Sequence, residues 1–487
     1  MERREFLKIA GVGAGTAAVA SWLAAPLAGA AEEPATSGGR RPNILLFQCH
    51  DLGQFLHCYG VKTVRTPNLD AFAAQGVRFP RMYCTAPQCS PSRASLFTGR
   101  WPHNNGVMGL CHAEFAWDLN PEERHLGQFL RDAGYATACI GTMHETRSKF
   151  QRCGYEKRLS DRYAQKATDN AIAILKQLAP QAVEKPFFMY VGTSEPHRQP
   201  YPAPTWPGSL PGDNGFPGPH LKPDDSLGVE VPPYLRDTEG ARRELAGLQG
   251  AVRHVDEQFG RLLAALKESG AEADTLVVFT TDHGIAMPRA KCSLYDPGVS
   301  VAFLLRLPSR KGWHGGVEPT AMVSNIDVLP TILDLVGVSV PANVQGRSLA
   351  PLLDGKPYEP RREIFTEMTY HNYYDPRRAI RTETHKLIVN FSTAPAFMDP
   401  SGCWRPQSDT VTPPNGAATF SNHVELYDLT RDPWEQNDLS GKPAAAPVLA
   451  DLLARLHKHL VETADPILQG AVASPHHGQA LALLERR

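Results

Sequence analysis

The stretch Cys84-Thr-Ala-Pro-Gln-Cys89-Ser90-Pro91-Ser92-Arg93-Ala-Ser-Leu-Phe-Thr98-Gly99 organises the chain. It has loop character up to Cys89, and Pro91 fits a first helical turn, where proline is tolerated. Cys89 therefore lies at the N-terminus of a predicted helix, where free N–H groups and the helix dipole favour an anion. Arg93 follows one turn later on the same face. The pattern indicates a sulfur nucleophile, or a group made from it, that faces a bound anion.

A short Cys-x-Pro-x-Arg pattern is equally consistent with a small buried cysteine. The longer string from Cys89 to Gly99 resembles the signature of the sulfatases. In that family the signature cysteine is oxidised to formylglycine, the catalytic aldehyde. The resemblance implies the same modification at Cys89, and it implies a formylglycine-generating maturase as a partner.

Length and composition favour a large enzyme. The 487 residues have 42% hydrophobic content, which suffices for one large domain and a smaller one. The net charge of −1 gives no global field that points to nucleic acid or to a membrane surface. The nine cysteines are an odd number, so at least one stays unpaired, and their pairing cannot be read from the sequence.

Residues 1–30 have the layout of an export signal. Arg3-Arg4 precedes an apolar, Ala/Gly-rich run from Ile9 to Ala28, and Ala28-Gly29-Ala30 matches a small-residue cleavage site. This layout predicts a bacterial twin-arginine (Tat) signal peptide, with the Tat translocase as a partner and a periplasmic or secreted location. A membrane anchor is the alternative, but Pro26 and the cleavage site favour the signal peptide.

Short apolar strands alternate with helices over residues 41–355. The expected strands are 43–47, 135–140, 186–191, 275–281 and 301–307, and the expected helices start at Pro67 or span 126–133, 166–179, 244–269 and 327–336. Thr66 and Asp327 are the expected N-caps of the first and last of these helices. The alternation predicts an α/β sheet wound with crossovers. The sulfatase resemblance implies that this sheet is large and mixed, mostly parallel, and flanked by helices.

Two further regions depart from that alternation. Segments 363–368, 378–381 and 385–391 look like strands of an antiparallel sheet, and 425–433 follows before a helix around 446–461, so residues 360–470 are predicted to form a smaller C-terminal α+β domain. Residues 199–235 are rich in Pro and Gly and have no period. Such a long loop is often the border or lid of an active site.

Polar side chains follow the ends of the predicted strands. Asp51, His144, His197 and the pair Asp282-His283 each come just after an apolar run. Sites in open α/β sheets gather beyond the carboxyl ends of the strands. A lone histidine is more often a satisfied core or surface residue, whereas a paired Asp282-His283 at a strand end lacks a core role.

The sulfatase resemblance extends over nearly the whole mature chain. Its landmarks are Arg41-Pro-Asn-Ile-Leu, Asp51-Leu-Gly, Thr66-Pro-Asn-Leu-Asp, Pro196-His197, Thr281-Asp282-His283-Gly284 and Leu426-Tyr-Asp-Leu-Thr-Arg-Asp-Pro-Trp-Glu. It implies an alkaline-phosphatase-like fold. Within the family the chain is most similar to the heparan N-sulfatases (sulfamidases), through Cys89–Gly99, 185–191, 274–280 and Leu294-Tyr295 after Lys291.

The resemblance also implies a metal site. One divalent cation, calcium in this family, acts as Lewis acid and template. Asp51, Asp282 and His283 match metal-ligand positions, and residue 89 as hydrated formylglycine supplies a further oxygen. His50 stands where the family usually has a second Asp, and imidazole suits transition metals better than calcium. His50 is therefore a weaker ligand, a supporting residue, or a sign of another metal.

The remaining roles are implied in the same way. Arg93 matches the residue that steadies the diol, and His144 matches the position that hydrogen-bonds it or accepts its proton. His197 and Lys291 match sulfate contacts, one of them a candidate acid for the leaving group. His371 could reach the pocket from the second domain as a substrate-binding residue.

Three hypotheses follow. The leading one is an exported sulfatase that cleaves O-sulfate or N-sulfate from a sulfated glycan, or sulfate from an aryl sulfate. The second is a phosphonate or phosphodiester hydrolase of the same superfamily. The third is a catalytically degenerate glycan-binding protein, suggested by His50 and by Thr142, which stands where the family often has a lysine that clamps sulfate.

Overall fold

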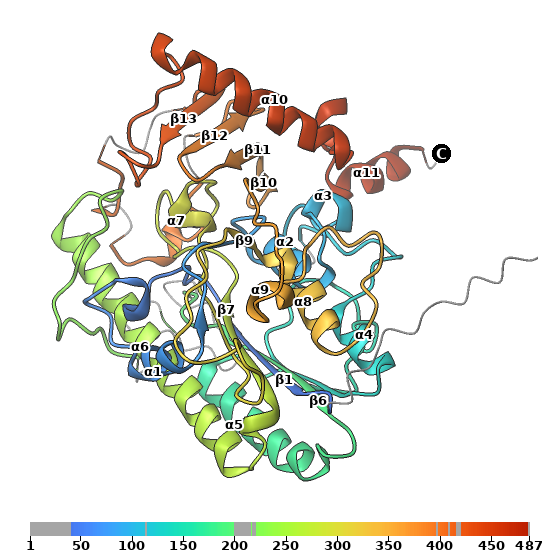
Figure 1. The fold of residues 1–487 in the computed structure, drawn as a ribbon. Helices are drawn as coiled ribbons and strands as arrows, with labels where there is room; N and C mark the ends of the chain where they lie inside the picture. The colour runs from blue at the N-terminus through green and yellow to red at the C-terminus, as the bar shows by residue number, and fades with distance from the viewer. Residues whose placement is uncertain are drawn as a thin grey trace, which may run out of the picture. The chain divides into compact units, whose positions relative to one another are not determined.

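The main sheet has seven strands. They are Asn43–Cys49 (β1), Val77–Arg78 (β2), Ala136–Gly141 (β4), Lys157–Leu159 (β5), Phe187–Gly192 (β6), Thr275–Thr281 (β7) and Phe303–Arg306 (β8). Their order is β2-β8-β7-β1-β6-β4-β5 (Figure 1). Strand β8 pairs antiparallel with β2 and β7, and the other ladders are parallel. The predicted mixed, mostly parallel sheet is confirmed.

Helices cover both faces of this sheet. They are Pro67–Gln75 (α1), Cys89–Thr98 (α2), Pro102–Asn105 (α3), Leu126–Asp132 (α4), Ala164–Leu178 (α5), Glu239–Glu268 (α6), Asp296–Val299 (α7), Val328–Leu335 (α8) and Ala350–Leu353 (α9). Helices α1, α5 and α6 pack in one hydrophobic core, and α2, α4 and α8 pack in another. Each of the expected helices in this region is present.

Strand β1 separates the two cores. Ile44 and Leu46 belong to the core with α2, while Leu45 and Phe47 belong to the core with α6. Successive side chains of a strand point to opposite faces, so a continuous apolar run buries both. All seven residues of β1 are buried, as expected for a central parallel strand.

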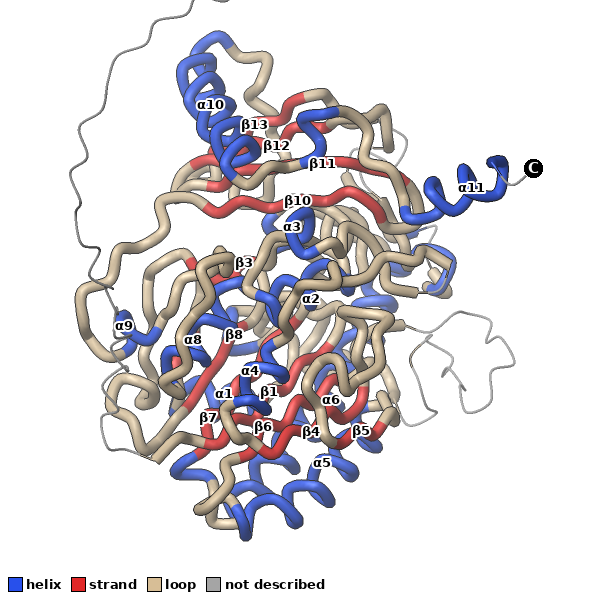
Figure 2. The backbone as a smooth tube through the Cα atoms, turned by 90° about the vertical axis from the view of Figure 1, so that its right-hand side faces the viewer, coloured by secondary structure: helices blue, strands red, loops and turns tan. Residues whose placement is uncertain are grey.

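The C-terminal region forms a second sheet. Strands Ile364–Tyr370 (β10), Tyr374–Arg381 (β11), His385–Asn390 (β12) and Val424–Asp428 (β13) pair antiparallel in sequence order. Helix Ala446–Glu462 (α10) packs on them through Leu452, Leu456 and Leu460, and Figure 2 shows this sheet as a layer separate from the main one. A short parallel pair, Met82–Tyr83 (β3) with Val323–Ser324 (β9), and helix Pro475–Glu485 (α11) complete the elements. The smaller C-terminal α+β region is confirmed, and its boundaries at 360 and 470 stay a prediction.

The computed structural model describes residues 40–112, 114–198, 216, 221–395, 398–407, 410–414 and 420–485. They belong to one compact unit. The predicted leader, residues 1–30, and most of the predicted loop at 199–235 lie outside the described residues. Among the described helices, none combines the length and apolar character that crossing a membrane requires.

The two predicted N-cap side chains act differently from the prediction. Thr66 precedes α1, but its hydroxyl accepts from the backbone N–H of His57 and donates to Asp70, and it makes no cap bond. The Asp327 carboxylate accepts from the backbone of Ser324 and Arg347 instead of capping α8. Both residues stand at the predicted N-cap positions, but neither side chain bonds the N–H groups of its helix, because tertiary partners outcompete the local helix terminus for these side chains.

The N-terminus of α1 is instead capped from a distant helix. The carboxylate of Asp256, on α6, accepts from the backbone N–H groups of Asn68 at 3.2 Å and Leu69 at 2.8 Å. Asp256 also accepts from the Asn68 side chain at 2.8 Å and is fully buried. This carboxylate therefore satisfies two of the helix N–H groups that a local N-cap would otherwise serve.

We expect Asp256→Ala to lower the free energy of unfolding by about 1–2 kcal/mol, because loss of a helix cap costs that much. Asp169→Ala is the matched control, because this exposed carboxylate on α5 also bonds a residue of α6, Arg261. Its free energy of unfolding should stay within about 0.5 kcal/mol of the wild-type value. Chemical denaturation of both variants measures the difference. Equal small losses would show that Asp256 does not anchor α1.

Candidate active site

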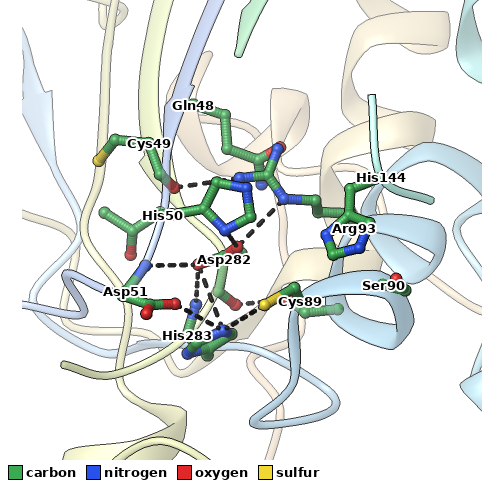
Figure 3. A network of polar contacts seen from close by, with 12 residues as sticks. Gln48, Cys49, His50, Asp51, Cys89, Ser90, Arg93, His144, Asp282 and His283 are labelled. Carbon is green, nitrogen blue, oxygen red and sulfur yellow. Dashed lines mark hydrogen bonds and ion pairs between the residues drawn. The ribbon is translucent and has the colours of Figure 1, made fainter. Parts of the chain in front are cut away.

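The ends of two neighbouring parallel strands bring the predicted metal ligands together. In the β1–β7 ladder Cys49 lies opposite Thr281, so the residues that follow each strand are adjacent. His50 Nδ1 lies 3.0 Å from Asp282 Oδ2, and His283 Nε2 lies 3.3 Å from Asp51 Oδ1. The predicted juxtaposition at the carboxyl edge of the sheet is therefore present in the structure (Figure 3).

Asp282 is the centre of this group. Its Oδ1 accepts two backbone hydrogen bonds, from the N–H of Asp51 at 3.0 Å and from the N–H of the next residue, His283, at 2.9 Å. Its Oδ2 accepts from Arg93 Nε at 3.1 Å. Both side chains of the Arg93–Asp282 pair are fully buried. A buried charge pair is retained only when its hydrogen bonds are satisfied, so these contacts fix both loops.

Cys89 is the first residue of α2, as the sequence predicts. Its Sγ lies 3.3 Å from His283 Nε2, and the side chain is directed at the metal-ligand group (Figure 3). Burial raises the pKa of the Cys89 thiol to about 12. An unmodified Cys89 is thus a neutral thiol, which is a poor nucleophile compared with a thiolate.

The helix that carries Cys89 is fixed from several directions. Ser92 donates its hydroxyl to the Asp282 carbonyl, and Asn325 Nδ2 donates to the Ser92 carbonyl at 2.9 Å. Every residue of α2 is buried. Gly99 ends the helix with φ +67°, a left-handed conformation that favours glycine. The signature string therefore builds a rigid helix whose N-terminus points at the site.

Arg93 makes contacts that the sequence did not indicate. Its Nη1 donates to Tyr190 Oη at 2.6 Å and to Gln48 Oε1 at 3.1 Å, and its Nη2 donates to the Cys49 carbonyl at 3.4 Å. Gln48 and Tyr190 were missed, because each lies inside an apolar strand run. The sequence signal that could have identified them is a polar side chain in an otherwise apolar, buried strand, because such a side chain needs a hydrogen-bond partner.

Lys291 enters the site as a partner of Asp51. Its ammonium donates to both Asp51 oxygens, at 3.0 and 2.9 Å, and the side chain is buried. Burial raises the pKa of Asp51, but the neighbouring His197 and Lys291 charges bring it well below its ordinary value. Asp51 is therefore an ionised carboxylate. The predicted contact of Lys291 with sulfate stays a prediction.

The predicted histidines lie around the group at different distances. His197 Nε2 is 3.7 Å from Asp51 Oδ2, and the ring centroids of His50 and His144 are 5.8 Å apart. His144 contacts His112, and their Nε2 atoms are 2.6 Å apart. One of these two nitrogens therefore carries a proton and donates a hydrogen bond to the other. His112 was unassigned from the sequence. The catalytic roles of His144 and His197 stay predictions.

His371 comes from the C-terminal region, at the end of β10. It is buried, and burial followed by the positive charge of Lys291 lowers its pKa to about 3. The His371 ring is therefore within electrostatic reach of Lys291. Its Nδ1 lies 2.8 Å from the Asn372 side chain. The substrate-binding role of His371 stays a prediction.

The group offers donors for a cation. His50, Asp51, Cys89 and Asp282 place one ligand atom each within 4.8 Å of one another, and all four are buried. Burial, with Arg93 nearby, lowers the pKa of His50 to about 4, so this imidazole is neutral at pH 7. Carboxylates and neutral imidazoles are metal ligands. The donor set therefore fits one divalent cation.

Backbone strain is concentrated at the same place. Asp51 has φ 49°, and Arg289 and Cys292, which flank Lys291, have φ 61° and 59°. Non-glycine residues in the left-handed region are uncommon and gather at functional sites. The two loops that carry Asp51 and Lys291 are thus held in conformations that the surrounding contacts impose.

Family models cover most of the described chain. The sulfatase model matches residues 42–338, and the model for the C-terminal region of N-sulphoglucosamine sulphohydrolase matches residues 288–406. Human N-sulphoglucosamine sulphohydrolase is 31% identical over 468 residues, which cover 88% of this chain and 91% of the human one. An N-acetylglucosamine-6-O-sulfatase of Bacteroides thetaiotaomicron is 25% identical over 538 residues, covering 90% and 89%.

Solved structures share the fold. The complex of BT4656 with its substrate D-glucosamine-2-N,6-O-disulfate aligns with a TM-score of 0.66 at 23% identity, covering 88% of this chain and 99% of that one. The phosphonate monoester hydrolase of Silicibacter pomeroyi aligns with a TM-score of 0.61 at 23% identity, covering 87% and 96%. The family matches and the human relative together place this chain in the sulfatase family of hydrolases.

Proposed function

We propose that this chain removes sulfate from a sulfated glycan, by hydrolysis of a sulfate ester or a sulfamate, with residue 89 as formylglycine and a divalent cation beside it. The observation that carries the proposal is the position of Cys89. It begins α2, and its Sγ lies 3.3 Å from His283 within the buried group of Asp51 and Asp282.

The electrostatics around residue 89 suit a sulfate group. The N-terminus of α2 favours an anion, and Arg93 and Lys291 add two fixed positive charges. Because these groups are held by buried contacts before substrate arrives, they do not reorganise during the reaction. The charge that shifts onto the leaving atom is thereby stabilised in place.

The remaining roles in the reaction belong to side chains of this chain. Arg93 holds Asp282, and it orients the first turn of α2 through the same contact. Either His197, which is partly exposed next to Asp51, or Lys291 is the candidate donor of a proton to the leaving oxygen or nitrogen. His144, on the His50 side, is the candidate acceptor of a proton from residue 89. Formylglycine supplies an oxygen nucleophile, and the cation supplies Lewis-acid polarisation.

The substrate class rests on the relatives. The human relative is an N-sulphoglucosamine sulphohydrolase, and the Bacteroides relative is an N-acetylglucosamine-6-O-sulfatase. Both names point to sulfated glucosamine, one with an N-sulfate and one with an O-sulfate. We infer a glycosaminoglycan-type substrate, without assigning the linkage.

The partners and location that belong to this proposal are a formylglycine-generating maturase and the Tat translocase, with a periplasmic or secreted bacterial enzyme. The twin-arginine motif Arg3-Arg4 supports export. The resemblance implies calcium for the cation, although two of the side chains at the site, His50 and His283, are imidazoles, which calcium does not favour.

The test of the function is turnover on a panel of O-sulfated and N-sulfated disaccharides, with aryl sulfate and aryl phosphonate esters alongside. We expect sulfate release to exceed phosphonate hydrolysis. A higher rate on the phosphonate ester would favour the phosphonate hydrolase hypothesis. Binding of sulfated disaccharide without turnover, at full formylglycine content, would favour a glycan-binding protein.

We expect the intact mass of protein made beside a maturase to fall by about 18 Da, because the Cys89 thiol becomes an aldehyde. Cys89→Ala should show no such shift and no sulfate release. Cys58→Ala changes a half-buried cysteine outside the site, and this variant should keep both the mass shift and the sulfate release. Full activity with an unmodified Cys89 thiol would contradict the mechanism.

We expect Lys291→Ala to lower kcat/KM by roughly 10²–10³, because a fixed cation near the developing charge is lost. Thr142→Lys should be neutral or mildly favourable on small aryl sulfates, since it places a positive group where relatives have one. Steady-state kinetics at matched formylglycine and metal content measure both.

The Lys291 ammonium also pairs with Asp51, so thermal melts separate lost folding from lost catalysis. Lys267→Ala, an exposed change at the end of α6, is the control. Near wild-type kcat/KM in folded Lys291→Ala would show that residue 291 does not clamp sulfate.

A further inference from the structure

The side chains that surround Asp282 offer nitrogen as well as oxygen. His50 Nδ1 lies 3.0 Å from Asp282 Oδ2, and His283 Nε2 lies 3.3 Å from Asp51 Oδ1 and 3.6 Å from Asp282 Oδ1. Calcium takes six to eight oxygen ligands, whereas imidazole suits zinc, iron and related transition metals. This donor set of two carboxylates and two imidazoles does not fit calcium well.

The tautomer of His283 directs a lone pair into the group. Its Nδ1 lies 3.0 Å from the Gly284 carbonyl oxygen, which can only accept, so Nδ1 carries the proton. In a neutral ring Nε2 then has no proton, and it faces the sulfur of Cys89 at 3.3 Å as well as oxygens of Asp51 and Asp282 at 3.3 and 3.6 Å. A metal-ligating histidine typically donates its other N–H to a backbone carbonyl in this way.

His50 supplies a second, independent observation. Only 4% of this residue is exposed, and its Nδ1 lies 3.0 Å from Asp282 Oδ2. A neutral imidazole either donates to this carboxylate through Nδ1 or, in its other tautomer, offers the Nδ1 lone pair to a cation that Asp282 also holds. The geometry therefore places His50 Nδ1 directly beside the carboxylate of a predicted metal ligand.

The spacing of the donors is compatible with short metal bonds. Bonds of about 2.0–2.2 Å, at angles between octahedral and tetrahedral, separate donors by roughly 2.8–3.6 Å. The contacts that link His50 to Asp282, Asp282 to His283 and His283 to Asp51 are 3.0, 3.6 and 3.3 Å long. The ligand atoms of His50, Asp51 and Asp282 also belong to one group that lies within 4.8 Å of one another.

We propose that the cation of this site is a first-row transition metal of the kind that imidazole favours, with Zn²⁺ as the reference ion, in place of calcium. The proposal rests on the proposed function only in taking this group to be the metal site. His50 and His283 are then direct ligands, beside Asp51 and Asp282. Asp51, Asp282 and His283 stand at positions that the resemblance implies as metal ligands, whereas His50 replaces an expected carboxylate with an imidazole.

The first test measures the metal content of the purified, formylglycine-containing enzyme by elemental mass spectrometry. We expect about one equivalent of a transition metal and little calcium. After removal of metal with a chelator, equilibrium dialysis and thermal melts follow binding of Zn²⁺ alone and Ca²⁺ alone. We expect Zn²⁺ to bind roughly 100-fold or more tightly than Ca²⁺. Equal or tighter Ca²⁺ binding would overturn the proposal.

Two substitutions test the nitrogen ligands separately. His283→Asn and His50→Asp each replace an imidazole with an oxygen donor, and each should shift the preference toward Ca²⁺ by roughly 10-fold or more. His57→Asn is the matched control, because His57 belongs to the segment after β1 but pairs with Asp70. If both site variants fold and keep the wild-type preference, the imidazoles are not ligands.

A final control addresses Cys89, whose unmodified thiol would itself favour zinc. The dialysis is repeated with Cys89→Ala, where the preference for Zn²⁺ should persist. Loss of the preference would assign it to the thiol and overturn the proposal. Metal content and melting temperature can be measured without turnover, so they test this proposal separately from the proposed function. A protein that binds zinc but releases no sulfate would refute the sulfatase function alone. An active enzyme that holds calcium would refute this proposal alone.

Discussion

The buried carboxylate of Asp282 is the interaction on which the site depends. It accepts from the backbone N–H groups of Asp51 and His283, and it pairs with the fully buried side chain of Arg93 at 3.1 Å. A buried carboxylate is costly unless it is paired and hydrogen-bonded. Its partners come from three separate segments, so satisfying this one charge fixes the loops after β1 and β7 and the helix α2 relative to one another.

The second sheet also supports the signature helix. The backbone N–H of Glu367, on β10, donates to the Thr85 carbonyl at 2.8 Å, and Gln88 Nε2 donates to the Tyr370 carbonyl at 3.1 Å. These bonds reach the loop that leads into Cys89. The C-terminal region therefore supports the loop that leads into Cys89, and the strand that makes these bonds, β10, ends just before His371.

Local patterns predicted the elements where burial repeats regularly, and they failed where a distant residue decides the outcome. The runs at 43–47 and 275–281 became β1 and β7 because continuous apolar residues fit a strand buried on both faces. Strand β5 was not predicted, since Lys157–Leu159 has three residues and no apolar run. The cap of α1 by Asp256 likewise leaves no mark in the sequence near that helix.

The sequence by itself determined the α/β fold, the helix that begins at Cys89, and the polar residues at the strand ends, because these follow from hydrophobic period, proline and strand length. Tertiary structure alone decided their pairing: Lys291 on Asp51, Arg93 between Gln48, Tyr190 and Asp282, and His112 on His144. Those contacts join residues far apart in the chain. Their geometry depends on strand order and register, and neither can be read from any one segment.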